Sequence, residues 1–410
     1  MTGVTLDSVA REASGRIIAA LAARFRDLDI AEEAFADACA RAVELWPQEG
    51  TPYDPAGWLY RIAERRALDA LRRRRTRDRF VPDDPPPEPT AEEAMIDDAR
   101  IIPDERLRLI FICCHPAIAI EARAALTLRL VCGLSTEEIA RAFLTAHATL
   151  AQRLIRAKRK IADSGVPYEV PGPETWPERL DAVLSTLEVA YAKAHEDALG
   201  TGTHAGYASE MLELTASLSN LLPNEQEVLS FAALVRYAEA RRGARLDHQG
   251  EMVPLSEQNP ALWRRDLIDE ANNYFERAFA LGPPAPRALQ AAIHGVWCRR
   301  KNLSEPAPWP AVLNLYDLLL VQRDDPVVRV NRTVALAEIA GVQAALDELD
   351  ALDTKILSEY LPYHALRADL LLRSGRSEEA RLAYEAALAL NPTAAEQAWL
   401  QQRMRKSSSC

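Results

Sequence analysis

The residues of this chain best suited to recognising a ligand are basic and amide side chains on one predicted helix. Between residues 146 and 162, apolar residues recur at the spacing of a single helix face. The opposite face carries Thr149, Gln152, Arg153, Arg156 and Arg159. Amide groups pair with adenine edges, and guanidinium groups pair with guanine edges or phosphates. The spacing therefore predicts a helix that reads duplex DNA in the major groove.

A capped helix and a short turn precede this recognition helix. Ser135 is an N-cap candidate, and Glu138 follows at the spacing of a capping box. Leu134 and Ile139 are placed for a hydrophobic staple. A turn near Leu144 then joins the two helices. The combination predicts a helix-turn-helix, whereas the basic residues alone would also fit an ordinary solvated helix face.

A second basic segment lies upstream. Residues 61–80 contain nine arginines on a predicted helix whose apolar residues occupy more than one side. Such a helix packs in a bundle and leaves one strip exposed, where the arginines from 72 to 75 would neutralise phosphates. Aromatic residues that could stack on an unpaired base are Tyr53, Trp58 and Tyr60. A solvated charge run is the plainer interpretation.

A third candidate surface is acidic. Residues 29–46 are predicted to form a helix with Glu32, Glu33 and Asp37 exposed. This face suits a basic or coiled-coil partner, although a merely solvated face is the simpler alternative.

The elements that position these surfaces are expected to be helices. The chain has 410 residues, of which 48% are hydrophobic and only 16 are glycine. This composition favours helix over sheet, and the length indicates more than one domain. We therefore expect an all-α protein with helical blocks at about 5–79, 92–162 and 178–405. Pro-rich segments at 81–90 and 163–177 separate them.

Charge is distributed unevenly along the chain. Residues 1–162 contain 25 basic and 25 acidic residues, whereas residues 163–410 contain 24 and 35. The net charge of −11 therefore belongs to the C-terminal part. An acidic chain is not a simple nucleic-acid binder, but the basic patches at 61–80 and 153–160 could hold DNA in two places.

The C-terminal block contains a repeat signal. Residues 271–283 and 380–392 both place Ala first, an aromatic at +4, Ala at +7, Leu at +10 and Pro at +12. Gly341 and Gly375 are 34 residues apart, which is the tetratricopeptide period. We expect helical hairpins whose concave surface suits a protein or peptide partner, with an Ala-rich bundle as the alternative.

Several classes of function find no support in the sequence. No apolar run approaches the roughly 18 residues that span a membrane, and the N-terminus lacks the pattern of a signal peptide. The six cysteines show neither disulfide nor zinc spacing, and no glycine-rich nucleotide loop is present. We expect a cytoplasmic protein that is not an enzyme, holds no metal or cofactor and has no membrane partner.

The order of these elements resembles a known family. An acidic helix, the segment PAGWLYRIAERRALDALRRRR, an acidic linker and a helix-turn-helix containing ATLAQRLIRAK follow one another. This order resembles the extracytoplasmic-function (ECF) group of the sigma-70 family over about residues 20–162. The segment DERLRLIFICCHP with a helical extension is similar to the ECF42-type subgroup, whose C-terminal domain is tetratricopeptide-like. The resemblance implies a sigma factor that binds core RNA polymerase and promoter DNA and is regulated by its C-terminal domain.

The resemblance also implies roles for individual residues. The clamp helices of the polymerase β′ subunit would be bound by Asp29, Glu32, Glu33 and Asp37. The −10 element would be opened and read by Trp58, Arg61, Arg65, Arg66, Arg72 and Arg73. The −35 element would be read by Thr149, Gln152, Arg153, Arg156 and Arg159. The domain carrying this last group would also contact the polymerase β flap.

The implied domain order has five parts. They are region 2 at 1–80, an acidic linker at 81–103, region 4 at 104–162, a second linker at 163–177 and a regulatory repeat domain at 178–405. Three positions depart from the family pattern. Glu64 and Arg65 stand where the family usually has Arg-Asn, and Ala36 stands where it usually has Gln. These departures bear on promoter preference and polymerase contacts rather than on the class of protein.

Two other classes of function account for parts of the sequence. A helix-turn-helix regulator with a sensor domain would bind duplex DNA without polymerase, but it has no need of the Trp- and Arg-rich helix. A scaffold with solvated basic helices has no need of a capped recognition helix. The sigma interpretation accounts for both helices, while the target promoters, the inducing signal and the sign of the regulation stay open.

Overall fold

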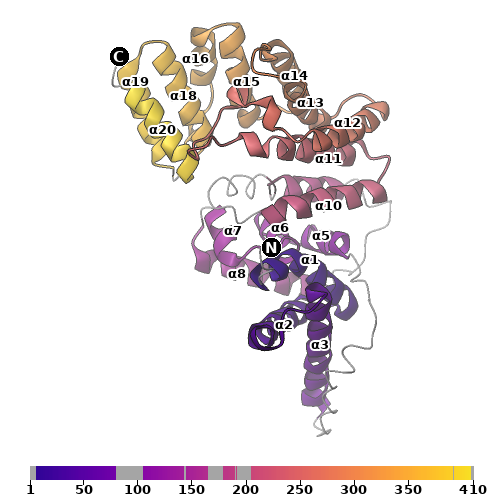
Figure 1. The fold of residues 1–410 in the computed structure, drawn as a ribbon. Coiled ribbons are helices and arrows are strands. Elements are labelled where there is room, and N and C mark those ends of the chain that lie inside the picture. The colour runs from indigo at the N-terminus through magenta and orange to yellow at the C-terminus, as the bar shows by residue number, and fades with distance from the viewer. Residues whose placement is uncertain are drawn as a thin grey trace. The chain divides into compact units, whose positions relative to one another are not determined.

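The computed structural model of the chain describes residues 6–79, 105–142, 145–164, 179–189, 191, 205–390 and 392–407. These residues are mostly helical, and the pairing of Leu246 with Met252 is an isolated bridge. The predicted all-α class is confirmed. The chain divides into two compact units at residues 194 and 195 (Figure 1). The predicted linker at 81–103 and most of the linker at 163–177 lie outside the described residues.

The first unit begins with three helices that pack on one another: α1 (Leu6–Phe25), α2 (Leu28–Glu49) and α3 (Pro55–Arg79). Asp27 caps α2 by accepting a hydrogen bond from the Ile30 amide at 2.9 Å. Asp54 accepts one from the Gly57 amide at 2.9 Å at the start of α3. These caps satisfy amides that have no partner within the helix, and so fix where both helices begin.

The first unit has two halves: residues 6–79, with α1 to α3, and the described residues from 105 onward. α1 is buried on several sides because it packs on helices of both halves. Ile17, Ala19 and Leu21 are at most 1% exposed, although these positions cannot share one helix face. α1 contacts α2 and α3, and it also contacts α5 (Arg106–Cys113) and α6 (Ile120–Leu130). The two halves of the unit therefore share α1 as a common core element.

The closest approach in this packing lies at Gly15 of α1. A β-carbon at this position would overlap the Val131 carbonyl oxygen, directly after α6. The neighbouring Ser14 is also buried. Small side chains thus let α1 lie against the backbone of the second half, and glycine is required at the point of contact.

The predicted pair of helices follows as α7 (Thr136–Ala142) and α8 (His147–Asp163). Leu134 and Ile139 are buried, in keeping with the predicted staple. The apolar stripe of α8 is buried at Leu150, Leu154, Ala157 and Ile161, as its spacing predicted. α8 packs on α6 and α7 through this stripe. Leu144 and the side chain of Glu138 lie outside the described residues.

Helical residues 179–189 belong to the first unit, although the sequence placed them in the C-terminal domain. Val183 and Leu187 are fully buried. The Arg179 guanidinium donates a hydrogen bond to the Phe111 carbonyl oxygen at 2.6 Å and lies over the Phe111 ring. The first compact unit therefore extends past the second predicted linker.

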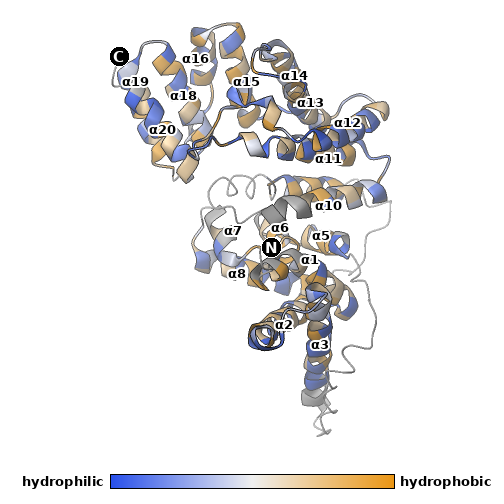
Figure 2. Ribbon diagram, viewed as in Figure 1, coloured by the Kyte–Doolittle hydropathy of each residue, from blue (hydrophilic) through white to orange (hydrophobic). Residues whose placement is uncertain are grey.

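The second unit is an array of helices, each packed mainly on the next one or two along the chain. They are α10 (Ala205–Leu221), α11 (Gln226–Ala240), α12 (Arg265–Ala280), α13 (Pro286–Cys298), α14 (Trp309–Gln322), α15 (Pro326–Ile339), α16 (Val342–Asp350), α17 (Thr354–Leu357), α18 (Leu361–Arg373), α19 (Ser377–Leu388) and α20 (Ala394–Ser407). Figure 2 shows apolar and polar residues alternating along these helices, as one buried and one solvated face require. Neighbour-to-neighbour packing is typical of helical repeats. None of the described helices is long and apolar enough to cross a membrane.

The two repeated sequence segments occupy equivalent positions in α12 and α19. Ala271 and Ala278 of α12 are fully buried, and so are Ala380 and Ala387 of α19. The aromatic at +4 is fully buried as Tyr384 in α19 and partly buried in α12. The repeat signal therefore marks positions where small residues let neighbouring helices approach closely.

The two glycines at the repeat period lie in turns between helices. Gly341 has φ 92° between α15 and α16, and Gly375 has φ 79° between α18 and α19. A β-carbon would meet nothing within 4 Å at either position. The left-handed backbone conformation, rather than lack of space, therefore requires glycine there.

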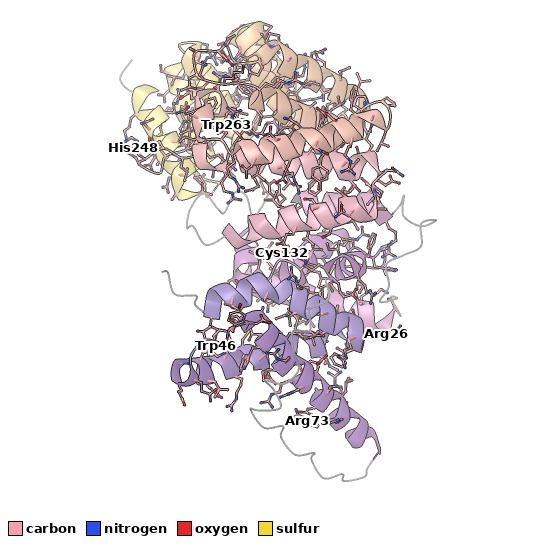
Figure 3. The ribbon with its side chains drawn as sticks, turned by 45° about the vertical axis from the view of Figure 1, so that its right-hand side comes forward. Arg26, Trp46, Arg73, Cys132, His248 and Trp263 are labelled. Carbon is pink, nitrogen blue, oxygen red and sulfur yellow. The ribbon has the colours of Figure 1, made fainter. Side chains whose placement is uncertain are left out.

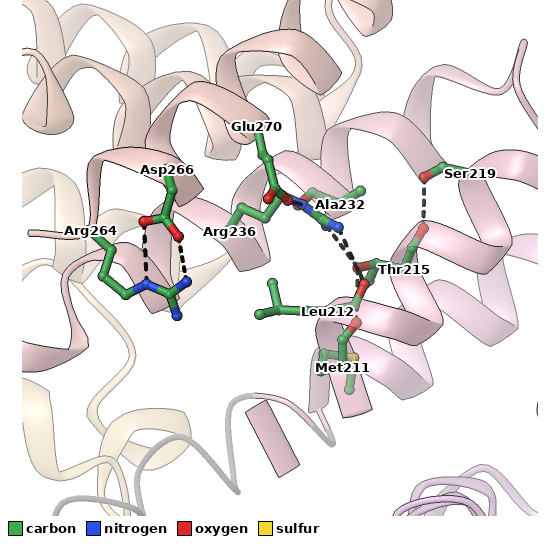
Figure 4. A network of polar contacts seen from close by, with 9 residues as sticks. All are labelled: Met211, Leu212, Thr215, Ser219, Ala232, Arg236, Arg264, Asp266 and Glu270. Atoms are coloured by element: carbon green, nitrogen blue, oxygen red, sulfur yellow. Dashed lines mark hydrogen bonds and ion pairs between the residues drawn. The ribbon is translucent and has the colours of Figure 1, made fainter. Parts of the chain in front are cut away.

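A buried arginine joins the first three helices of the second unit (Figure 4). Arg236 of α11 pairs with Glu270 of α12 at 2.9 Å. It donates to the Thr215 hydroxyl at 3.1 Å and to the Leu212 carbonyl oxygen at 3.3 Å, both on α10. Its guanidinium also lies 4.5 Å from the ring centroid of Tyr274. One side chain that is 4% exposed thus links α10, α11 and α12.

Candidate nucleic-acid interface

The outer face of α8 carries the side chains predicted to read the −35 element. Exposed side chains on it are Thr149, Gln152, Arg156 and Arg159, and Arg153 is partly exposed. Arg156 donates a hydrogen bond to the Gln152 amide oxygen at 3.2 Å, and Arg159 lies 3.5 Å from Asp163. Exposed pairs of this kind are weak. These groups can therefore exchange their contacts for base edges or phosphates.

The arginines of α3 form a second basic surface. Arg66, Arg72 and Arg73 are exposed, and Arg61 and Arg65 are partly buried. The C-terminal half of α3 projects past α1 and α2, and Arg73 lies on this projecting part (Figure 3). Figure 2 shows a hydrophilic stretch in the same half of the helix. A projecting helix with exposed guanidinium groups suits a phosphate backbone.

Two carboxylates of the first unit already pair with this arginine run. Arg72 lies 3.6 Å from Asp69, and Arg74 lies 2.8 Å from Asp27, the residue that caps α2. Arg73 donates to the Asp69 carbonyl oxygen at 3.3 Å. Solvent screens these pairs, so they contribute little and leave Arg72 and Arg73 able to bind phosphate. The side chain of residue 75 lies outside the described part of the helix.

The three aromatic candidates for base stacking differ in exposure. Tyr53 is fully exposed and Trp58 is partly exposed, with the Trp58 ring edge-on to Trp46 at a centroid distance of 5.7 Å. Tyr60 is buried, and this burial raises the pKa of its hydroxyl. The prediction that Tyr60 could stack on a base is therefore wrong for this structure, because its ring is enclosed by the bundle.

Glu64, which departs from the family pattern, has a structural role. It pairs with Arg24 of α1 and accepts a hydrogen bond from the Tyr60 hydroxyl at 3.4 Å. Its side chain is only 17% exposed. This position therefore joins α3 to α1, while the neighbouring Arg65 remains partly exposed.

The acidic face of α2 is only half open. Glu33 and Asp37 are exposed as predicted, and the side chain of Asp29 is 55% exposed. The side chain of Glu32 is 17% exposed. The prediction that Glu32 is exposed is therefore wrong, and the reason lies in α6 and α8.

Two basic side chains from the second half of the first unit bind this acidic face. Lys158 Nζ of α8 lies 2.6 Å from Asp29 Oδ1 and 2.8 Å from Glu32 Oε2. Arg129 Nε of α6 lies 3.3 Å from Glu32 Oε1. Burial acts to lower the pKa of Lys158, but its hydrogen bonds to the two carboxylates outweigh burial and raise it.

Sequence reasoning missed Lys158 and Arg129 as partners of α2. Asp29 and Glu32 stand three residues apart, so both lie on one helix face where a single cation can reach them. Lys158 directly follows Ala157 of the buried stripe, which places it at the edge of the packed surface of α8. The spacing of the two carboxylates and the position of Lys158 beside the stripe can both be read from the sequence. Neither shows that Lys158 binds these carboxylates.

Three cysteines lie in the core of the first unit. Cys113, Cys114 and Cys132 are buried, as free cysteines commonly are. Burial raises the pKa of the Cys113 and Cys114 thiols, so both stay protonated near neutral pH. Throughout the described parts of the chain, no three His, Cys, Asp or Glu side chains are grouped in a way that could hold a metal ion.

A groove of about 520 Å³ opens in the second unit. It is lined by residues of α15, α18 and α20 together with the short helix η3 (Leu255–Glu257). Apolar side chains such as Val334 and Leu366 form part of its wall. Charged groups also line it, including Arg373, which lies 2.8 Å from Glu338. An apolar groove with charged edges can bind the apolar face of a peptide or helix.

The first unit falls into a known class of protein. Residues 10–77, which contain most of α1, all of α2 and nearly all of α3, match the sigma-70 region 2 family. The chain therefore contains a sigma-70 region 2 domain, which supports the role of an RNA polymerase sigma factor in transcription initiation and implies binding of core polymerase and promoter DNA.

One relative matches the chain over nearly all of its residues. The chain is 35% identical over 403 residues to the uncharacterized protein R00370 of Rhizobium meliloti (strain 1021), covering 97% of this chain and 95% of the relative. Residues 179–279 match a family of unknown function, DUF6596. This segment begins with the helical residues that complete the first unit and ends in α12. It therefore includes parts of both compact units, and Arg236 lies within it.

Proposed function

We propose that the chain is a sigma factor of the extracytoplasmic-function type, with α8 reading the −35 element. The observation that carries this proposal is the face of α8 opposite its buried stripe. It presents Thr149, Gln152, Arg153, Arg156 and Arg159 in the same compact unit as the region 2 match. Short and amide groups near the start of the helix suit base edges, and the later arginines suit guanine or phosphate.

The −10 element is assigned to α3 and the loop before it. Holding a melted base out of the stack costs a few kcal/mol, which stacking and phosphate contacts offset. Trp58 offers a partly exposed ring for this stacking. The guanidinium groups assigned to the phosphates are those of Arg61, Arg65, Arg66, Arg72 and Arg73. Exposed Tyr53 is a second candidate for stacking.

The core polymerase is assigned to α2. Asp29, Glu32, Glu33 and Asp37 lie along this helix and would bind basic residues of the β′ clamp helices. Glu33 and Asp37 are exposed in the free chain. The half of the unit that contains α8 would in addition contact the β flap.

Reconstitution with purified bacterial core polymerase tests these assignments. The full-length chain is expected to co-elute with core polymerase and to support run-off transcription from specific promoters in a genomic library. A Thr149→Ala, Gln152→Ala double variant should still co-elute but lose the specific transcripts, because both side chains are exposed and fill no core. If the chain instead bound duplex DNA by itself and never bound core polymerase, it would be a helix-turn-helix regulator.

We further propose that the second unit is tetratricopeptide-like and regulates the first by binding a protein or peptide in its groove. Its helix-to-helix packing, its equivalent buried alanines and its own groove support this proposal. Residues 163–410, which include this unit, carry the whole net charge of −11, so DNA is an unfavourable ligand for it.

Two surface variants test the role of the groove. Val334 lines the groove and is 36% exposed, whereas Val321 of α14 is 86% exposed and does not line it. Val334→Arg is expected to change promoter-dependent transcription in cells, and Val321→Arg is expected to leave it unchanged. Equal transcription from both variants and the unmodified chain, with unchanged thermal stability, would remove the groove from the regulatory proposal.

A further inference from the structure

We propose that the free chain keeps part of its own polymerase-binding face closed, because Lys158 of the DNA-reading helix binds Asp29 and Glu32. The two halves of the first unit must then separate before these carboxylates can meet core polymerase. This inference rests on the proposed function, since it concerns the carboxylates assigned there to the polymerase.

Both oxygens of the Glu32 carboxylate are already paired with a cation. Lys158 Nζ lies 2.8 Å from one carboxylate oxygen, and Arg129 Nε lies 3.3 Å from the other. Asp29 takes a second bond from the same ammonium at 2.6 Å. The side chains of Lys158 and Glu32 are only 20% and 17% exposed, so solvent screens this pair less than a surface pair. A new cation must therefore compete with Lys158 and Arg129 for Glu32.

The closed arrangement does not depend on these side chains alone. α1 contacts α2 and α3 of one half and α5 and α6 of the other. The fit of Gly15 against the Val131 carbonyl oxygen brings the halves into backbone contact. The bridge from Lys158 is therefore one edge of a packed interface that positions α8 over the acidic face of α2.

The exposed residues of α2 suggest how polymerase would open the contact. Glu33 and Asp37 are free of this bridge and exposed beside it. A basic partner can therefore bind them first and then compete with Lys158 for Asp29 and Glu32. The DNA face of α8, which includes Gln152 and Arg156, is exposed in the closed state. Closure therefore acts on polymerase binding and leaves the DNA face uncovered.

Removal of the bridge gives a direct test. Fluorescently labelled full-length chain is titrated with core polymerase in the absence of DNA, comparing the unmodified chain, Lys158→Ala and Lys160→Ala. Lys160 is exposed on the same helix, so its variant matches the change in charge. Binding by Lys158→Ala is expected to be about fivefold tighter, because a larger fraction of the chain is open, while Lys160→Ala binds like the unmodified chain.

A second variant opens the same interface from its other side. Gly15→Ala places a methyl group against the Val131 carbonyl oxygen and should force α1 away from α6. Amide hydrogen exchange within α1 should then be faster in both Gly15→Ala and Lys158→Ala than in the unmodified chain, without polymerase present. If Gly15→Ala does not fold, Lys158→Ala alone decides the question.

The possible outcomes separate this inference from the proposed function. If the unmodified chain binds core polymerase and Lys158→Ala binds equally well or more weakly, Lys158 does not mask the face and the sigma function stands. If neither the unmodified chain nor any variant binds core polymerase, the proposed function fails and the masking inference fails with it. Tighter binding by Lys158→Ala with faster exchange in α1 supports the closed state.

Discussion

Arg156 and Lys158 stand two residues apart on α8 and face different partners. A rotation of about 100° per residue places their side chains on well-separated sides of the helix. Arg156 is exposed beside Gln152, whereas Lys158 is bound to the carboxylates of α2. Substitutions along one helix should therefore separate into effects on DNA and effects on polymerase.

For the DNA face, we expect Gln152→Ala and Arg159→Ala to act differently. Gln152→Ala removes an amide that can pair with a base edge, so discrimination at one promoter position should fall by about 1–3 kcal/mol. Arg159 is expected to contact phosphate, so Arg159→Ala should weaken binding to all promoters alike. The number of counterions released on binding, measured from the salt dependence of the binding constant, should fall by about one. Competition binding of the holoenzyme to a set of single-position promoter variants measures both effects. An unchanged base preference in Gln152→Ala would count against base contact by this residue.

The cysteines allow a prediction on reactivity. Burial raises the pKa of Cys113 and Cys114, and it raises that of Cys39 to about 11. A raised pKa leaves less thiolate at a given pH, so alkylation is slow below the raised value and accelerates as the pH approaches it. At about pH 8, iodoacetamide should leave all three thiols of the native chain largely unmodified and should label them in urea. Site-resolved mass spectrometry gives the readout, and rapid labelling of native Cys113 would show that the core opens on that timescale.

At the scale of elements, two arginines that lie near each other in Figure 4 differ in how many helices they contact. Arg236 bridges α10, α11 and α12, whereas Arg264 pairs with exposed Asp266, two residues further along the chain, at 2.5 Å. Arg236→Ala removes the hydrogen bonds to the Thr215 hydroxyl and the Leu212 carbonyl oxygen, the pair with Glu270 and the contact with the Tyr274 ring. It should lower the free energy of unfolding by about 3 kcal/mol.

Arg264→Ala is the matched control, because it also removes one guanidinium from the same neighbourhood. It should leave the thermal unfolding of the chain nearly unchanged, since its partner is solvated. Unfolding followed by circular dichroism compares the two variants. Similar melting temperatures for both would mean that the buried network does not hold the three helices together.

Elements governed by local spacing could be predicted from the sequence, but contacts between distant segments could not. The stripe of α8 from Leu150 to Ile161 follows from helical periodicity, and the buried alanines of α12 and α19 follow from their repeated spacing. The bridge from Lys158 to Glu32 joins residues 126 positions apart, and no local pattern contains that information. The burial of Tyr60 could not be predicted for the same reason, because it depends on how α3 packs against other helices and not on the local sequence of α3.

At the scale of the whole molecule, the boundary between the compact units decides how the chain should be divided. Truncation after residue 194 keeps helical residues 179–189, whereas truncation after residue 164 removes them. Val183 and Leu187 are fully buried, and each such side chain contributes about 1.5–3 kcal/mol. The shorter fragment should therefore unfold at a clearly lower temperature than the longer one.

The same pair of fragments tests regulation by the second unit. The fragment 1–194 should be stably folded and should differ from the full-length chain in promoter-dependent run-off transcription. Loss of activity in the shorter fragment alone would report instability rather than regulation. If the fragment 1–194 and the full chain transcribe equally, the regulatory role of the second unit is excluded.

The position of α1 also affects how the protein is made. α1 leaves the ribosome before α6, which contacts it and ends about 100 residues later in the chain. At synthesis rates of about 5–20 residues per second, α6 is completed about 5–20 s after α1, and the surface of α1 that packs on α6 lacks its partner during this time. Apolar side chains such as Ile17 and Leu21, buried in the finished protein, must meanwhile be protected by α2 and α3 or by chaperones. Completion of the first unit is thus timed by translation of its second half.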